Sequence, residues 1–243
     1  MENAITAGLS RQIVLARALD IAANNVANQT TAGFKAERVN FREYVSQIET
    51  PNGGDPTVSL VYDSDTYTDF SSGGLETTHA PLDFSIDGEG FFAVQTDVGI
   101  GYTRDGHFGL NSFGELVNRD GAQVLDEGGA PVLIDPEAGP VVMSRDGELQ
   151  QRGTPVAKLG VFAFDDVRSL RKTGANLFAA DIDTLTPARS SIRQGFIELS
   201  NVSPVGAMTE MIEILRAYEN AAQVVQTADE LTRNAVRTLT QTN

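Results

Sequence analysis

The sequence has 243 residues, of which 41% are hydrophobic, so it is long enough to bury a sizeable core as one domain or two modest ones. Its 18 basic and 33 acidic residues give a formal net charge of −15, which argues against binding nucleic acid through phosphate neutralisation. The chain contains no cysteine, which excludes disulfides and thiolate metal sites.

The charge is distributed unevenly along the chain. Residues 1–36 carry a net charge of +1 and residues 205–243 a net charge of −2, which leaves −14 for the segment between them. Nearly neutral ends can approach like ends without strong repulsion, whereas an acidic middle suits a surface that faces solvent. The N-terminus lacks the features of a secretory signal, and no segment reaches the roughly 20 apolar residues of a membrane span. We therefore expect no direct membrane insertion, and we expect any export from the cytoplasm to use a route that does not depend on a secretory signal.

Residues 1–36 are predicted to form an N-terminal helix. The helix should end near Asn28, because the polar residues that follow compete for backbone hydrogen bonds and Gly33 tolerates a positive φ. Its apolar residues recur at steps of three and four, as in an amphipathic helix, with only Gln12 interrupting the row: Ile5, Leu9, Ala16, Leu19, Ala23 and Val26.

Residues 75–200 are predicted to form a compact, mostly antiparallel β domain. Short runs of β-forming residues, such as residues 91–94, alternate with turn residues. Residues 37–74, which contain two Gly-Gly pairs, are predicted to be a partly extended connector. Three predicted turns contain the same tripeptide, Arg-Asp-Gly, whose Asp-Gly pair favours two-residue hairpin turns: Arg104-Asp105-Gly106, Arg119-Asp120-Gly121 and Arg145-Asp146-Gly147.

Residues 201–243 are predicted to form a C-terminal helix that pairs with the N-terminal one. Ser203 can accept hydrogen bonds from the first free amides, and Pro204 fits the first helical position. The stripe steps by three and four without interruption: Met208, Met211, Leu215, Tyr218, Ala222, Val225, Asp229, Thr232, Val236 and Leu239.

These elements predict an α+β fold in which long, paired, coiled-coil-like terminal helices flank an inserted, mostly antiparallel β domain. Helices of roughly 50 Å and 40 Å exceed the roughly 26 Å diameter expected of the β domain, so they should project from it. Two interpretations remain open. The helices form an ordinary intramolecular hairpin, or neighbouring molecules complete their apolar stripes.

Motifs at both ends of the chain and in its middle bear on this choice. They are residues 23–35 (Ala-Asn-Asn-Val-Ala-Asn-Gln-Thr-Thr-Ala-Gly-Phe-Lys), 87–92 (Asp-Gly-Glu-Gly-Phe-Phe), 102–106 (Tyr-Thr-Arg-Asp-Gly), 200–202 (Ser-Asn-Val), 216–219 (Arg-Ala-Tyr-Glu) and 227–231 (Thr-Ala-Asp-Glu-Leu). Together they resemble the bacterial flagellar rod and hook proteins over nearly the whole chain.

The resemblance implies a structural subunit, not an enzyme, of the flagellar basal-body rod, the shaft that crosses the periplasm and transmits torque from motor to hook. The short chain and Ser203-Pro204-Val205 are most similar to the proximal rod subunits, with a distal rod or hook subunit as the alternative. It further implies helical assembly with copies of itself and other rod proteins, and export through the flagellar type III apparatus. The terminal helices would form an inner tube, with the β domain outside and no cofactor.

The resemblance also assigns roles to individual residues. Asn24, Asn25 and Asn28 are poor helix formers, so we predict that they hydrogen-bond at the helix end or between subunits, with solvent-facing caps as the alternative. Gly33 is predicted to supply a backbone conformation at a structural turn, and Phe34 to pack behind it. The predicted packing positions of the helical layer, unless they seal only an intramolecular hairpin, are Leu9, Ala16, Leu19, Met211, Leu215, Tyr218, Ala222 and Val225.

No catalytic, cofactor or metal site is predicted. His79 and His107 belong to no metal-spaced cluster and are expected at the surface. Residues 87–90 lack the spaced acidic ligands of a calcium loop and are expected to form a hairpin turn. Two further functions remain open: a secreted β-rich binding module with oligomerising helices and, on its acidic residues alone, a carbohydrate-active enzyme.

Overall fold

The structure is a computed structural model that describes the backbone of residues 2–47, 57–144, 147–174, 176–180, 185–187 and 190–241. The chain divides into two compact units. The first, which we call the helical unit, contains Met1–Ala27, Glu37–Asp69 and Ser203–Asn243, and the second, the β unit, contains Asn28–Ala36 and Phe70–Val202. The fold is α+β, as predicted, with a helix near each end of the chain and antiparallel strands between them.

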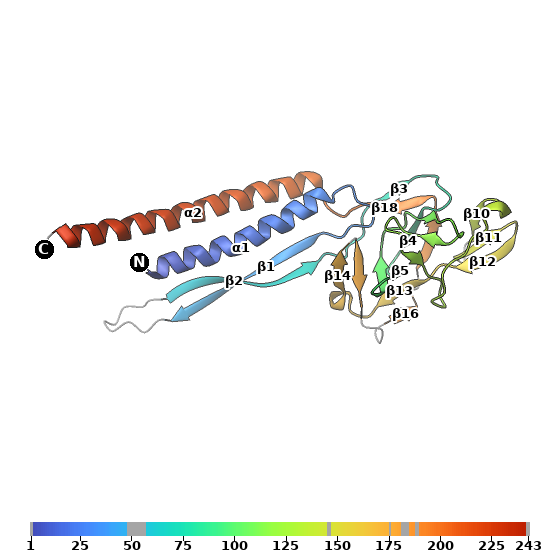
Figure 1. Ribbon diagram of the computed structural model, residues 1–243, viewed down its shortest axis with the longest axis horizontal. Coiled ribbons are helices and arrows are strands. Elements are labelled where there is room, and N and C mark those ends of the chain that lie inside the picture. The colour runs from blue at the N-terminus through green and yellow to red at the C-terminus, as the bar shows by residue number, and fades with distance from the viewer. Residues whose placement is uncertain are drawn as a thin grey trace. The chain divides into compact units, whose positions relative to one another are not determined.

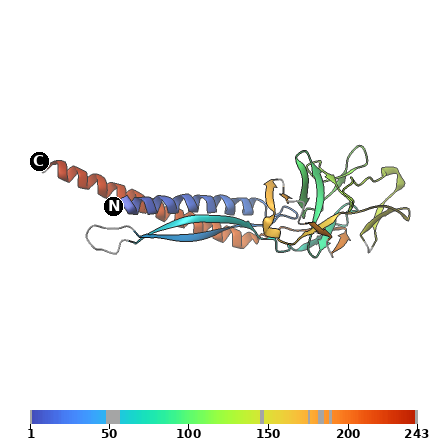
Figure 2. The same ribbon diagram turned by 90° about the horizontal axis from the view of Figure 1, so that it is seen from below.

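The helical unit contains the two long helices. Helix α1 spans Glu2–Ala27 and helix α2 spans Pro204–Gln241. They lie side by side and run in opposite directions (Figures 1 and 2). Ser203 caps α2, since its carbonyl oxygen accepts from the Ala207 amide at 2.8 Å and its hydroxyl from the Gly206 amide at 3.4 Å. The start of α2 thus matches the predicted Ser-Pro signal.

Two strands complete the helical unit, in the segment 37–74 that we expected to be a connector. Strand β1 (Glu37–Gln47) pairs antiparallel with strand β2 (Thr57–Thr68), in a register from Glu37↔Thr68 to Gln47↔Thr57. This hairpin contacts α1. The segment therefore contains an ordered hairpin, because its Val, Thr, Tyr and Phe residues favour strands more than its Gly-Gly pairs favour a linker.

The β unit is built around one nine-stranded sheet, and every strand pair described in it is antiparallel. Its strands are β5 (Phe91–Thr96), β6 (Gly99–Thr103), β7 (Gly109–Leu110), β8 (Leu116–Val117), β9 (Gln123–Val124), β13 (Val161–Phe164), β14 (Arg171–Gly174), β15 (Leu177–Ala179) and β16 (Leu185–Pro187). Smaller sheets pair β3 (Leu75–Thr77) with β18 (Phe196–Glu198), β4 (Phe84–Asp87) with β17 (Ser191–Gln194), and β10 (Val141–Met143) with β11 (Glu148–Gln151) and β12 (Thr154–Lys158). Short 3-10 helices lie at Pro136–Ala138 and Val167–Ser169.

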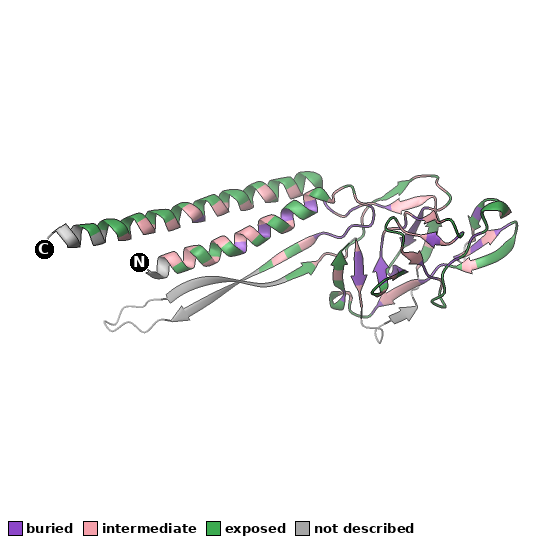
Figure 3. Cartoon of the chain, viewed as in Figure 1, coloured by how far each residue is buried: buried purple, intermediate pink, exposed green. Residues whose placement is uncertain are grey.

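The core of the β unit lies on both faces of strand β5. Side chains alternate between the two faces of a strand, so Phe92 and Val94 join one buried cluster while Phe91 and Ala93 join another. The second cluster is aromatic, with the Tyr102 and Phe164 rings 4.9 Å apart in an edge-to-face arrangement. Figure 3 shows buried residues concentrated in these strands.

The predicted Asp-Gly hairpin turns differ in outcome. Asp120-Gly121 does join paired strands, β8 and β9, through a five-residue loop in which the Asn118 side chain accepts the Asp120 and Ala122 amides. Asp105-Gly106 closes no hairpin, because β6 pairs with β5 and β15 and not with the strand that follows. Arg145 and Asp146 lie outside the described residues.

The prediction of a hairpin turn at residues 87–90 is also wrong. Strand β4, which precedes it, pairs with β17 and not with β5. The loop instead presents the Gly88 carbonyl oxygen to the Arg104 side chain. Local turn signals were therefore outweighed by long-range strand pairing.

Substitution of Phe92 tests the assignment of the core. Phe92→Ala removes a ring that is 0% exposed, and the resulting cavity should lower the free energy of unfolding by about 3–5 kcal/mol. Phe113→Ala removes a ring that is 82% exposed and should change it by less than about 0.5 kcal/mol. Urea denaturation of the purified chains measures both values, and equal effects would contradict the assignment.

Candidate assembly interface

Helix α1 buries a face that the predicted stripe did not include. Val14, Ala18 and Ala22 are buried, whereas Leu9 is 51% exposed and Ala16 and Leu19 are half-buried. The reason is that α1 is contacted by the β1–β2 hairpin as well as by α2. Helix α1 is therefore covered by two neighbours within its own unit.

Helix α2 packs on α1 through part of its predicted stripe. Met211, Tyr218, Ala222 and Val225 are half-buried, and Leu215 is exposed. The contact is close at Gly8 of α1, where a Cβ atom would lie 2.6 Å from Cγ2 of Val225. Glycine at this position allows the two helices to approach each other.

Large apolar side chains remain exposed on both helices. We use the term open helix face for these residues together, although those on α2 lie on more than one side of the helix: Leu9, Ile13, Val205, Met208, Ile212, Leu215, Val224 and Leu231. Single exposed apolar residues are ordinary, but this many on two adjacent helices are typical of a surface that binds another protein. The open helix face is the candidate interface, and it includes Leu9 and Leu215 from the predicted set.

The asparagines at the end of α1 have different environments. Asn25 is buried, and its side chain donates to the Glu37 carbonyl oxygen at 2.8 Å and accepts the Glu37 amide at 3.0 Å. These two hydrogen bonds attach the start of β1 to the end of α1. Asn28 accepts from the Thr31 amide and hydroxyl, at 3.1 Å and 3.2 Å, and Asn24 is exposed.

Gly33 and Phe34 belong to the β unit. Gly33 has a φ of 66°, its amide donates to the Glu198 carbonyl oxygen at 2.7 Å, and an added Cβ would lie 2.3 Å from the Asp105 nitrogen. The positive φ and the close backbone both require glycine. Phe34 is buried, with the Lys172 ammonium 4.2 Å from its ring centroid.

A buried charge network lies next to this turn. The Glu198 carboxylate, on β18, accepts from the Lys35 ammonium at 2.6 Å and from the Arg104 guanidinium at 3.2 Å. The Gly73 amide donates to the same carboxylate at 2.9 Å. Lys35 and Glu198 are 1% and 2% exposed, so each charge depends on the others for compensation.

Backbone carbonyl oxygens complete the network around its two cations. Lys35 also donates to the Ser71 carbonyl oxygen at 2.7 Å, and Arg104 to that of Gly88 at 2.8 Å. Burial lowers the pKa of the Arg104 guanidinium, and the Glu198 carboxylate acts in the opposite direction. Asn201 joins the segment before α2 to the segment before β1, because its side chain accepts a hydrogen bond from the Ala36 amide at 2.8 Å.

Local sequence patterns do not predict this network. Lys35 and Arg104 belong to the family motifs, but Glu198 lies outside the motifs given above. The available signal was a carboxylate inside the otherwise apolar run Phe196-Ile197-Glu198-Leu199, since an acidic residue in a buried strand requires a cationic partner.

The remaining predictions concern histidines, metals and membranes. His79 is exposed, and His107 is half-buried, with its Nδ1 atom 3.0 Å from the Asp83 carboxylate. In the described part of the chain, no three His, Asp or Glu side chains are arranged to hold a metal ion. Neither helix, over its described residues, combines the length and apolarity that a membrane span requires.

Neutralising Glu198 tests the network. Glu198→Gln leaves Lys35 and Arg104 buried without an anion and should lower the free energy of unfolding by about 3–5 kcal/mol. Glu76→Gln is the matched control, because Glu76 lies on the paired strand β3 but is exposed, and it should change the value by less than about 0.5 kcal/mol. Thermal and urea unfolding measure the stability of both variants, and equal stability would contradict the role of the Glu198 carboxylate.

Alanine substitution at two glycines separates steric clash from backbone strain. Gly33→Ala and Gly121→Ala both place a side chain at positive φ, at a cost of about 1–2 kcal/mol. Only at Gly33 does the new Cβ meet backbone atoms, which should add about 1–3 kcal/mol. Urea unfolding should therefore rank Gly33→Ala as the less stable variant, and the reverse order would count against a close approach at Gly33.

Three family models match successive parts of the chain. The model for the flagella basal body rod protein matches residues 5–35, and that for the flagellar hook protein FlgE/F/G D1 domain matches residues 85–151. The model for the flagellar basal body rod FlgEFG protein C-terminal region matches residues 193–238. These segments include most of α1 with the Gly33 turn, the strands around Arg104, and Glu198 with most of α2.

Curated relatives agree with the family models over the full length. The chain is 42% identical to flagellar basal-body rod protein FlgF of Caulobacter vibrioides, over 100% of both chains. It is 37% identical to FlgF of Mesorhizobium japonicum, over 98% of each, and 29% identical to flagellar basal-body rod protein FlgG of Bacillus subtilis, over 97% of this chain and 98% of that one. The chain belongs to the flagellar basal-body rod protein family.

Proposed function

We propose that this chain is a structural subunit of the flagellar basal-body rod, where it assembles with other rod proteins and with copies of itself. The observation that supports this most directly is the open helix face, whose apolar side chains are exposed on two helices of the same unit. A subunit whose stripes are completed by neighbours accounts for that exposure. Family membership indicates which assembly those neighbours form.

We further propose a subunit of the FlgF type, in the proximal rod, because two relatives with that name have higher identity than those named FlgG. The proposed arrangement is helical, with the terminal helices paired like a coiled coil in an inner tube and the acidic β unit outside. Torque would pass through the helical layer. The proposed route to the periplasmic part of the basal body is the flagellar type III export apparatus. We assign the chain no enzymatic role.

A valine pair tests the proposed function. Val224 is 56% exposed on the open helix face and Val98 is 94% exposed in the β unit. Both substitutions to Asp should leave folding nearly unchanged, because both side chains already face solvent. In cells that lack the chromosomal copy, Val98→Asp should restore swimming in soft agar, whereas Val224→Asp should not.

Immunoblots of isolated basal bodies give the decisive measurement. The wild-type and Val98→Asp chains should be present, and the Val224→Asp chain should be reduced at least about tenfold, since a carboxylate buried in an apolar contact costs more than 1.4 kcal/mol. Normal amounts of Val224→Asp in rods, with normal swimming, would contradict the role of the open helix face.

A further inference from the structure

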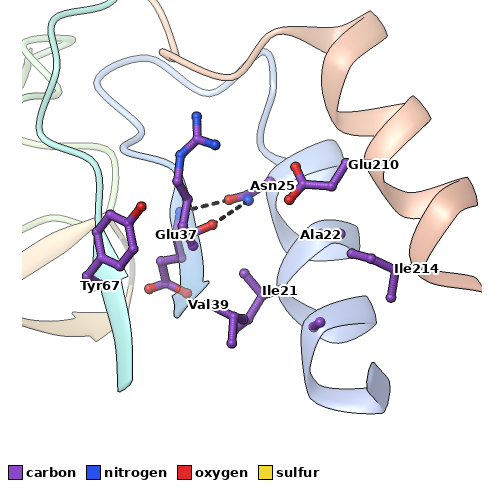
Figure 4. A pocket seen from close by; sticks show the side chains of 10 residues that line it. Ile21, Ala22, Asn25, Glu37, Val39, Tyr67, Glu210 and Ile214 are labelled. Atoms are coloured by element: carbon purple, nitrogen blue, oxygen red, sulfur yellow. Dashed lines mark hydrogen bonds between the residues drawn. The ribbon is translucent and has the colours of Figure 1, made fainter. Parts of the chain in front are cut away.

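The helical unit contains a cavity, which none of the described residues fills. It has a volume of about 210 Å³ and lies between α1, α2, β1 and β2 (Figure 4). Ala18 and Ala22 of α1 line it together with Ile21, Val39 and Ile214. One water molecule occupies about 30 Å³ in the liquid, so the cavity has room for an aliphatic side chain.

The cavity is preformed, because its walls are attached to each other. The two hydrogen bonds between the Asn25 side chain and the Glu37 backbone hold β1 at a fixed distance from α1. The small side chains of Ala18 and Ala22 then leave the space between them unfilled. A binding partner would therefore spend little free energy on opening this site.

The surroundings of the cavity are acidic. Glu37 and Glu210 line it, and the third charged residue that lines it, Arg38, is 3.5 Å from the Asp69 carboxylate. Glu210 is exposed, so it is accessible to a partner. An apolar side chain flanked by positive charge complements a site of this kind.

The first half of α1 carries such a side chain. Ile13 is 64% exposed, and Leu9 lies one turn before it on the same side of the helix. Arg17 lies one turn after Ile13 on the same side of the helix, where it also donates to the Thr66 hydroxyl at 3.5 Å, and residues 3–19 contain no acidic residue. Because Ile13 is exposed in its own chain, it does not fill its own cavity.

We propose that the cavity receives Ile13 from a second copy of this chain, with Leu9 packing at the rim. This contact joins two different surfaces, and repeated head-to-tail contacts of that kind generate open helical assemblies. The inference rests on the proposed function, and it adds which two surfaces meet.

Cysteine cross-linking tests the contact without background, since the chain has no cysteine of its own. Cells lacking the chromosomal copy would produce an Ile13→Cys chain and a Val39→Cys chain together, and their isolated basal bodies would be oxidised. We expect a disulfide-linked dimer of twice the 26.0 kDa chain mass only when both variants are present. A mixture of Val98→Cys with Val39→Cys is the control and should give no dimer.

Several results would overturn the inference. One is the absence of the mixed dimer from rods that contain both variants, and another is dimerisation of Ile13→Cys alone, which would require a symmetric contact. If either variant fails to enter rods, the purified full-length chains are mixed at high concentration and oxidised. The same mixed dimer is expected there, and its absence would equally contradict the inference.

Adding Glu210→Lys to the Val39→Cys chain should reduce the dimer yield severalfold, and an unchanged yield would count against the charge complementarity.

The outcomes also separate the inference from the proposed function. Rods that assemble normally from both cysteine variants but yield no mixed dimer would remove the contact and leave the rod role intact. Normal incorporation of Val224→Asp would instead weaken the rod role, whatever the cross-linking shows.

Discussion

The β unit depends on the buried carboxylate of Glu198, which lies between the Lys35 ammonium and the Arg104 guanidinium. Lys35 follows the N-terminal helix, Arg104 follows a central strand and Glu198 precedes the C-terminal helix, so one carboxylate joins three distant parts of the chain. Breaking a buried ion pair is costly because the remaining charges have no water to solvate them. The network therefore fixes the points at which the chain enters and leaves the β unit, and the Asn201 side chain on the Ala36 amide reinforces them.

The two units bury their apolar residues to different extents. In the β unit, Phe84, Phe92 and Phe178 are fully enclosed by strands far apart in sequence. In the helical unit, α1 and α2 bury small residues such as Ala18 and Ala221, while Ile13 and Val224 remain exposed. A fold with a complete core beside an incomplete one is consistent with a building block whose second core is finished by its neighbours. Under the proposed function, the apolar stripes of the two helices would serve assembly as well as folding.

Local sequence patterns were sufficient for some features and not for others. The steps of three and four predicted both helices, and the Ser203-Pro204 signal predicted the start of α2, because periodicity and capping act within a few residues. The glycine required at position 33 was likewise readable from its motif. The Gly-Gly pairs of residues 37–74 favour a connector, whereas the structure has the β1–β2 hairpin there, so the pattern of α1 alone does not show which face the hairpin covers. The pairing of Lys35 with Glu198 spans 163 residues of sequence and arises only from tertiary structure.

Hydrogen exchange of the backbone amides, compared between the purified chain and isolated rods, tests the central claim most directly. We predict that amides of the β unit core and the Gly33 amide exchange slowly in both states, because their hydrogen bonds are internal. Amides of α1 and α2 should exchange more slowly in rods than in the free chain, because we propose that neighbours cover the open helix face there. Strong and equal protection of both helices in the free chain and in rods would contradict it, since the helices would then be complete without other molecules.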